Sequence, residues 1–169
     1  MQRRTLLKLG VGATVTLAVL GGGLALLRPG LVDGRLSAVA RTLMRAVAEA
    51  VLDGSLPADA TSRAAALDAH LQRLEVLVAG LPPATRDELS QLLSLLSTAP
   101  GRLAMTGLAQ DWPEAGVASV QQAMQGMRLS GIAVRRQVHQ ALRDLTNAAY
   151  YADASTWALL GYPGPRPLS

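Results

Sequence analysis

Side chains that could carry out chemistry are few in this chain of 169 residues, which has no cysteine and two histidines, His70 and His139. Without cysteine the chain can hold neither a disulfide nor a thiolate metal site nor an iron–sulfur cluster. Two histidines are too few for a multi-histidine metal site within one chain. His139 has arginines around it in sequence rather than the carboxylate that a general base requires. We therefore expect no catalytic, metal-binding or cofactor-binding residue, interpret both histidines as solvated or interface residues, and expect no enzymatic activity of the chain alone.

The main group of charges in the body of the chain consists of four arginines near its carboxyl-terminal end. Spacings of seven or eight residues place most of them along one side of a helical region. They form either a solvated face or a surface that docks onto an acidic partner, because arginine makes bidentate contacts that suit interfaces. The residues of this predicted interface are Arg128, Arg135, Arg136 and Arg143.

The aromatic residues are concentrated after residue 149, although the whole chain has only two tryptophans, three tyrosines and no phenylalanine. Tyrosine and tryptophan are frequent anchors of protein interfaces. This segment therefore packs onto the chain's own helices, binds a partner, or does both. Its residues are Tyr150, Tyr151, Trp157 and Tyr162, followed by Pro163, Gly164 and Pro165.

The net charge of +4 belongs entirely to the first thirty residues, which contain Arg3, Arg4, Lys8 and Arg28 and no acidic residue. The remaining twelve basic residues balance twelve acidic ones. A neutral body with few aromatic residues argues against nucleic-acid binding. We therefore divide the chain into a segment 1–30 and a body 31–169.

The amino-terminal segment has the layout of an export signal, with basic residues followed by the uncharged stretch 9–27. Arg3 and Arg4, followed by Leu6, Leu7 and Lys8, resemble a twin-arginine signal. An ordinary secretory signal or a plain membrane anchor is the alternative. As a helix, the uncharged stretch would reach about 28 Å, close to the thickness of a bilayer core. The small residues at 38–40 fit a cleavage pattern but read as part of the next helix, so we favour an uncleaved anchor.

Hydrophobic periodicity predicts helices over about 34–53, 61–80, 85–96, 101–109, 111–129 and 132–152, with a short helical turn at 153–160. Asp33 is a plausible N-cap for the first of them. Two pairs, Thr85 with Glu88 and Asp111 with Glu114, have the spacing of a capping box. No segment alternates with a period of two, so we predict no sheet. The expected fold is all-α: a compact bundle of five to six helices, with an amino-terminal apolar signal or anchor helix and an extended Pro/Gly arm at the carboxyl terminus.

Taken with these motifs, the chain resembles the gluconate 2-dehydrogenase subunit 3 family, the small subunits of bacterial membrane-associated flavoprotein dehydrogenases. The resemblance covers the signal and roughly residues 90–165. Met127 and Ala152 depart from the residues that are common in that family. The matching pieces are Arg3-Arg4, Trp112, Arg128-Leu129-Ser130, Leu142 to Leu145, Tyr150-Tyr151, Trp157 and Gly161-Tyr162-Pro163-Gly164-Pro165.

The resemblance implies a non-catalytic subunit that supplies the twin-arginine signal for a large subunit lacking one, and that stays bound to it. The large subunit would be a glucose–methanol–choline oxidoreductase that binds FAD, and a cytochrome c subunit would accept electrons. The chain would carry no cofactor and would reach the periplasm through the twin-arginine translocase, with its amino-terminal segment in the inner membrane. The alternative function is that of a free-standing, membrane-anchored periplasmic scaffold.

Overall fold

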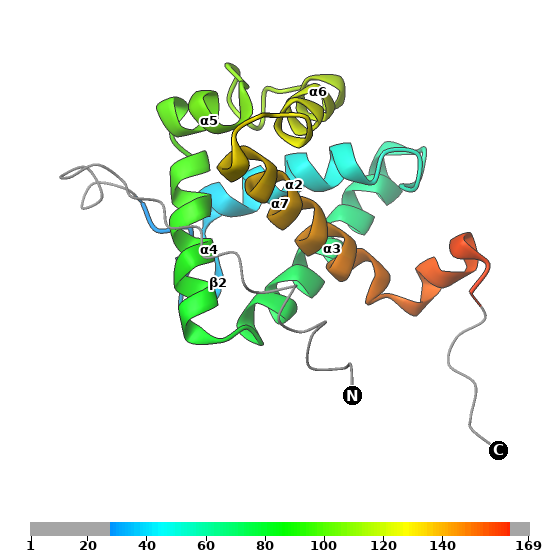
Figure 1. Cartoon of the computed structure of the whole chain (residues 1–169). Coiled ribbons are helices and arrows are strands. Elements are labelled where there is room, and N and C mark those ends of the chain that lie inside the picture. The colour runs from blue at the N-terminus through cyan, green and yellow to red at the C-terminus, as the bar shows by residue number, and fades with distance from the viewer. Residues whose placement is uncertain (1–27, 163–169) are drawn as a thin grey trace, which may run out of the picture.

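The computed structural model describes residues 28–162, and within the last helical turn it leaves out the side chains of residues 158–160. The predicted signal or anchor helix and the arm beyond Tyr162 lie outside the described residues. The described part is a helical bundle with one short hairpin (Figure 1). Its elements are β1 Leu31–Val32, β2 Arg35–Leu36, α2 Ala38–Val51, α3 Ala60–Ala79, α4 Pro83–Leu96, α5 Ala99–Thr106, α6 Val117–Arg128, α7 Ala133–Tyr151 and the 3-10 helix η2 Ala154–Leu160.

Helix α2 forms the centre of the bundle and contacts α3, α4, α6 and α7. Its buried face, which includes Leu43, Met44 and Val47, is inaccessible to solvent. The partners on the other helices are mostly aliphatic, such as Leu71, Leu93 and Leu142 on α3, α4 and α7. The chain has no phenylalanine, so its core consists mainly of branched aliphatic side chains, which pack densely and bring no polar atoms into the interior. The predicted all-α class and the six helices are confirmed for the described residues.

The prediction of no sheet is wrong at one place, because residues 31–36 form an antiparallel hairpin in which Leu31 pairs with Leu36. Asp33 and Gly34 make its two-residue turn, with φ values of 50° and 77°. Asp-Gly is a favoured pair for a turn that needs positive φ at both positions. Asp33 is therefore a turn residue and not an N-cap. Helix α2 instead begins after Ser37, whose side chain accepts a hydrogen bond from the backbone of Ala40.

The beginnings of α4 and α5 also differ from the prediction. Helix α4 begins at Pro83, with Pro82 as a cap that makes no side-chain hydrogen bond. Proline is well suited to the first helical position, where its missing N–H costs nothing. The helix therefore begins two residues before Thr85, and the predicted capping box of Thr85 with Glu88 does not form. Helix α5 begins at Ala99 after the N-cap Thr98, two residues before its predicted start, so Pro100 lies inside the first turn of the helix.

The segment before α6 is a turn rather than the first part of that helix. The carboxylate of Asp111 accepts hydrogen bonds from the backbone of Trp112 and from the guanidinium of Arg102, and no capping box with Glu114 forms. Helix α6 begins six residues later, at Val117, after Gly116. Among residues 28–162, no helix combines the length and the apolar character that a bilayer crossing requires.

Candidate functional site

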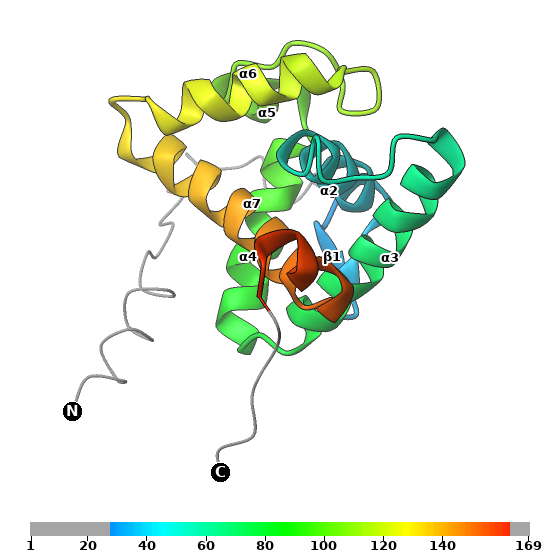
Figure 2. The ribbon, with the colours of Figure 1, turned by 90° about the vertical axis from the view of Figure 1, so that its right-hand side faces the viewer.

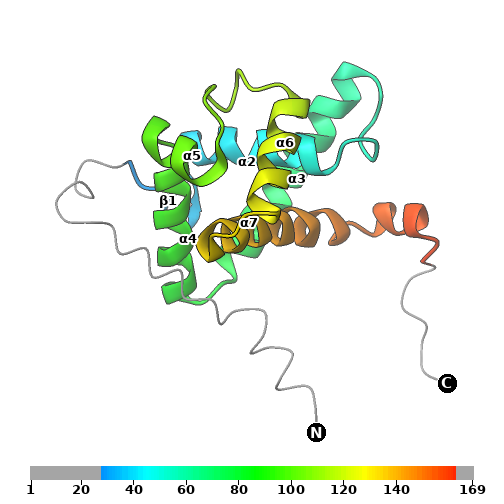
Figure 3. The ribbon, with the colours of Figure 1, turned by 45° about the horizontal axis from the view of Figure 1, so that its top comes forward.

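The structure places the predicted interface residues at the two ends of α7, except for Arg143, which lies near the middle of this helix. Arg128, Arg135 and Arg136 lie where α6 passes into α7. The aromatic residues lie at the other end of α7 and in the segment of η2, and Figure 3 shows α6 and η2 at opposite ends of α7. A helix of nineteen residues is about 28 Å long. The two groups are therefore separate surfaces and do not form a single patch.

Three of the four predicted arginines form hydrogen bonds within the chain. Arg135 donates two hydrogen bonds to the carbonyl oxygen of Ala104, from Nε at 3.0 Å and from a terminal nitrogen at 2.6 Å. Arg136 donates to the carbonyl oxygen of Ser130 at 2.6 Å. These acceptors lie in the last turns of α5 and in the α6–α7 connection. The two arginines therefore hold these segments to the start of α7, in addition to contributing positive charge to the surface.

Arg128 and Arg143 are exposed and lie close enough to His139 to act on it. Partial burial lowers the pKa of the His139 imidazole, and the positive charges of Arg143 and Arg128 lower it further, while Asp144 opposes them. The nearest charges are thus predominantly positive. An imidazole in this environment is poorly suited to act as a general base, which requires a carboxylate partner that supports its protonated form.

The four aromatic residues near the end of α7 differ in burial: Tyr150 is buried, Trp157 is half-buried, and Tyr151 and Tyr162 are exposed. Tyr150 is buried, and its hydroxyl donates to the carbonyl oxygen of Ser55 at 3.2 Å. Burial raises the pKa of this hydroxyl. The neighbouring Tyr151 is 41% exposed, with its ring edge-on to Tyr150 at 5.3 Å between centroids. Tyr150 therefore fixes the end of α7 to the α2–α3 connection, while Tyr151 faces solvent.

Trp157 of η2 and Tyr162, two residues beyond its end, form a second aromatic pair with ring centroids 5.5 Å apart. The indole of Trp157 donates to the carbonyl oxygen of Tyr151 at 2.8 Å, and the backbone of Tyr162 donates to that of Trp157 at 3.1 Å. Gly161, with φ of 67°, allows the chain to turn back between them. We name Tyr151, Trp157 and Tyr162 the aromatic end. Pro163, Gly164 and Pro165 of the predicted interface lie outside the described residues.

A cavity of about 240 Å³ lies beside the aromatic end and is lined by residues of α3, the α2–α3 connection, the end of α7 and η2. Figure 2 shows the arrangement of α3 and α7 in the bundle. Arg73 is one of the lining residues, with Nε donating to the carbonyl oxygen of Ala149 and a terminal nitrogen 3.1 Å from the carboxylate of Asp153. His70 also lines the cavity. This ion pair and hydrogen bond join η2 and the end of α7 to α3.

The interpretation of His70 as a solvated or interface residue is wrong, since the side chain is 1% exposed. Neither ring nitrogen has a hydrogen-bond partner among the described residues. Burial lowers the pKa of the imidazole to about 4, with Arg73 as a second cause. The sequence places His70 beside Leu71 but cannot show that this position of α3 faces the interior of the bundle.

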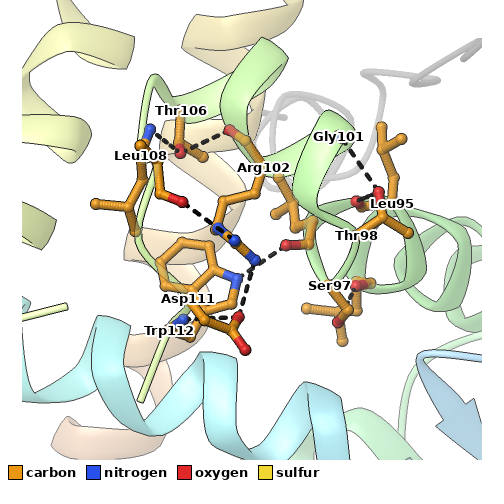
Figure 4. Close-up of polar contacts among 12 residues, drawn as sticks. Leu95, Ser97, Thr98, Gly101, Arg102, Thr106, Leu108, Asp111 and Trp112 are labelled. Carbon is orange, nitrogen blue, oxygen red and sulfur yellow. Dashed lines mark hydrogen bonds and ion pairs between the residues drawn. The ribbon is translucent and has the colours of Figure 1, made fainter. Parts of the chain in front are cut away.

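A buried polar cluster between α4 and α6 was not predicted at all (Figure 4). The guanidinium of Arg102 is almost completely buried and pairs with Asp111 at 2.8 Å, although that carboxylate is itself largely exposed. The indole of Trp112 donates to the carbonyl oxygen of Leu96, the last residue of α4, at 2.8 Å. Thr106 accepts a hydrogen bond from the backbone of Leu108. These contacts satisfy helix-end carbonyls and amides, so we assign the cluster a structural role.

Neither this cluster nor the cavity brings together groups that would hold a metal: among residues 28–162 no set of three histidine, aspartate or glutamate side chains converges. No nucleophile–base pair was predicted from the sequence either. The comparisons with known proteins give no further indication, because no protein-family model, curated protein or solved structure matches the chain. What remains as a candidate functional site is the pair of surfaces at the ends of α7.

Proposed function

We propose that this chain is a non-catalytic small subunit and export escort of an FAD-dependent dehydrogenase of the glucose–methanol–choline type. It binds the folded flavoprotein in the cytoplasm and recruits the twin-arginine translocase through Arg3 and Arg4, so that both reach the periplasmic side. FAD belongs to the partner, and a cytochrome c subunit that accepts electrons is a further candidate partner. The amino-terminal segment, with Leu6, Leu7 and Lys8, supplies the export signal and the membrane attachment.

The observation that carries this proposal is the aromatic end. The whole chain has five aromatic residues, and at this end Tyr151 and Tyr162 are exposed while Trp157 is half-buried. Large aromatic side chains stabilise a fold most when they are buried, so leaving them at the surface forgoes that gain. A partner that covers them recovers it, and such residues are typical hot spots of interfaces.

The rigidity of the aromatic end supports the same reading. Trp157 is held by its indole hydrogen bond to Tyr151, and the ion pair of Arg73 with Asp153 joins η2 to α3. Side chains that are already ordered lose little conformational entropy on binding. The resemblance to the gluconate 2-dehydrogenase subunit 3 family is the reason for proposing a flavoprotein as the partner. The positively charged first thirty residues, with Arg3 and Arg4, are the reason for proposing export through the twin-arginine translocase.

Export of the flavoprotein tests the proposal directly. Arg3 and Arg4 are replaced together by lysine, which preserves the charge, and the FAD-containing subunit is assayed in periplasmic and cytoplasmic fractions. The expected result is a flavoprotein stranded in the cytoplasm that still co-purifies with the chain. The matched control Arg35→Lys alters an exposed arginine of β2 and should leave export unchanged. Continued export of the flavoprotein with the double variant would overturn the escort function.

Binding is tested separately with Trp157→Ser and Tyr162→Ser combined, in a chain whose signal is intact. We expect the chain to be exported without the flavoprotein, because the aromatic contact is lost. Val32→Ser, which removes a side chain of β1 that is also 50% exposed, is the control and should retain co-purification. A chain that never co-purifies with a yellow, FAD-containing partner in any form would instead support the free-standing scaffold.

A further inference from the structure

The segment from α6 through most of α7 has an unusual charge pattern. Residues 115–143 contain four arginines and one histidine but no aspartate or glutamate. Since the body 31–169 is neutral overall, the compensating acidic residues all lie elsewhere in it. This part of the surface therefore carries a positive potential that is not balanced locally, which attracts and orients an acidic partner.

Exposed aliphatic side chains gather at the same end of the molecule. Leu129 and Ile132, in the α6–α7 connection, are 69% and 56% exposed, and Leu103 on α5 is 54% exposed. The hydrogen bonds from Arg135 to Ala104 bring the last turn of α5 to the first turn of α7, and so bring Leu103 to this end. Isolated exposed aliphatic residues are ordinary, but a group of them bordered by charges is typical of an interaction site.

The arginines here are held in place by hydrogen bonds, Arg135 and Arg136 by the backbone and Arg128 by a glutamine side chain. Arg136 and Arg135 use part of their donors on the carbonyl oxygens of Ser130 and Ala104, and Arg128 donates to Gln125 at 3.0 Å. A guanidinium has five donors, so each of these arginines keeps others for a partner. A fixed guanidinium plane suits the bidentate recognition of carboxylates. We name Leu103, Leu129 and Ile132, together with Arg128, Arg135 and Arg136, the arginine rim.

We propose that the arginine rim is a second docking surface, which binds a patch of aliphatic side chains bordered by aspartate and glutamate on the flavoprotein partner. The inference rests on the proposed function, because it takes the flavoprotein as the occupant. It adds that the partner is held at both ends of α7. An anionic bilayer is the competing occupant. We favour a protein because the ordered arginines match the planar carboxylates of a folded surface, whereas mobile headgroups require no such order.

The test measures binding of the full-length chain to the FAD-containing subunit in solution. Leu129→Ser combined with Ile132→Ser removes two of the three aliphatic side chains of the rim. Arg128→Glu reverses a charge whose one hydrogen bond among residues 28–162 is to a neighbouring glutamine side chain. We expect each change to weaken binding about tenfold or more. Arg128→Glu should also slow association and reduce its dependence on salt between low ionic strength and about 0.5 M.

Matched controls come from other faces of the molecule. Val76→Ser removes an aliphatic side chain of α3 that is 74% exposed, and Arg35→Glu reverses an exposed charge on β2. Both should bind like the unsubstituted chain, and all variants should keep its circular dichroism spectrum, because every replaced side chain is exposed.

The outcomes separate the two proposals. If the unsubstituted chain binds the flavoprotein and the rim variants bind equally well, the rim inference is overturned and the escort function stands. If the unsubstituted chain binds no flavoprotein, both proposals fail. If the rim variants lose binding to phosphatidylglycerol-containing vesicles while their affinity for the flavoprotein is unchanged, the rim is a lipid-binding surface and the inference is wrong.

Discussion

Burial of His70 should make the stability of the fold depend on pH in a window that few other groups affect. Its imidazole is 1% exposed, lies close to the positive charge of Arg73 and has a pKa lowered to about 4, against an ordinary value of 6.5. Above pH 6.5 both the folded and the unfolded chain hold it neutral. Between pH 6.5 and about 4 only the unfolded chain binds the proton, so the fold loses stability as the pH falls.

The size of this loss follows from the two pKa values. Each pH unit between them corresponds to about 1.4 kcal/mol, so the difference between 6.5 and about 4 amounts to about 3 kcal/mol of unfolding free energy. This is a large part of the total stability of an ordinary domain. The pKa values of the carboxyls of Asp59 and Asp153 are lowered from 3.8, so their contributions are lost only below that window.

The substitution His70→Leu tests this effect by removing the titrating group while keeping a side chain of similar size. Urea unfolding of the full-length chain, followed by circular dichroism at several pH values between 7 and about 4, gives the free energy of unfolding. The variant should lose about 3 kcal/mol less than the unsubstituted chain over this range. At pH 7 it should be equally stable or more stable, because two buried ring nitrogens without partners no longer have to be desolvated.

His139→Gln is the matched control, since His139 is only partly buried and its substitution should leave most of the pH dependence in place. The reasoning is refuted if the unsubstituted chain and His70→Leu lose the same stability between pH 6.5 and 4. It is also refuted if His70 titrates near 6.5 when its ring protons are followed by NMR.

Two further predictions concern the packing of α4 to α6. Trp112→Phe should lower the free energy of unfolding by about 1–2 kcal/mol in urea denaturation, because the Leu96 carbonyl loses its indole donor in a buried site; an unchanged midpoint would show that water replaces that donor. Gly101→Ala should destabilise the chain strongly in thermal unfolding, since the added methyl group would collide with the backbone oxygen of Leu95. Gly126→Ala in α6, where a methyl group would meet open space, should instead stabilise the chain by about 0.5–1 kcal/mol. Similar melting temperatures for the two variants would contradict the packing described.

The helices could be predicted wherever a regular apolar face coincided with a local signal at the ends. Helix α3 is an example, expected over 61–80 and observed over Ala60–Ala79, with Asp59 as its N-cap. The predicted helix boundaries were wrong where a residue type is equally common in two local structures. Asp33 is as suitable for a turn with Gly34 as for a cap, and only the contacts of the hairpin with α2, α3 and α4 decide between them.

The surfaces were harder to predict than the helices because exposure depends on contacts between distant segments. Tyr150 and Tyr151 are adjacent in sequence, yet one reaches Ser55 and is buried while the other faces solvent. The proximity of Leu103 to the arginines depends on the bond of Arg135 to Ala104, thirty-one residues away. Sequence spacing identified the arginines and the aromatic residues, but it could not show that α7 keeps them apart.

The way in which residues 28–40 join the bundle has a consequence for maturation by proteases. Ser94 donates to the carbonyl oxygen of Arg28, Ser90 accepts from the backbone of Leu31, and Gly30 lies so close to α4 that no side chain would fit there. The small residues at 38–40 form the first turn of α2, where Ala40 is inaccessible to solvent. A peptidase needs an accessible and locally unfolded segment. Cutting after Ala40 in the folded chain would thus require unwinding the first turn of the central helix and releasing the hairpin that precedes it.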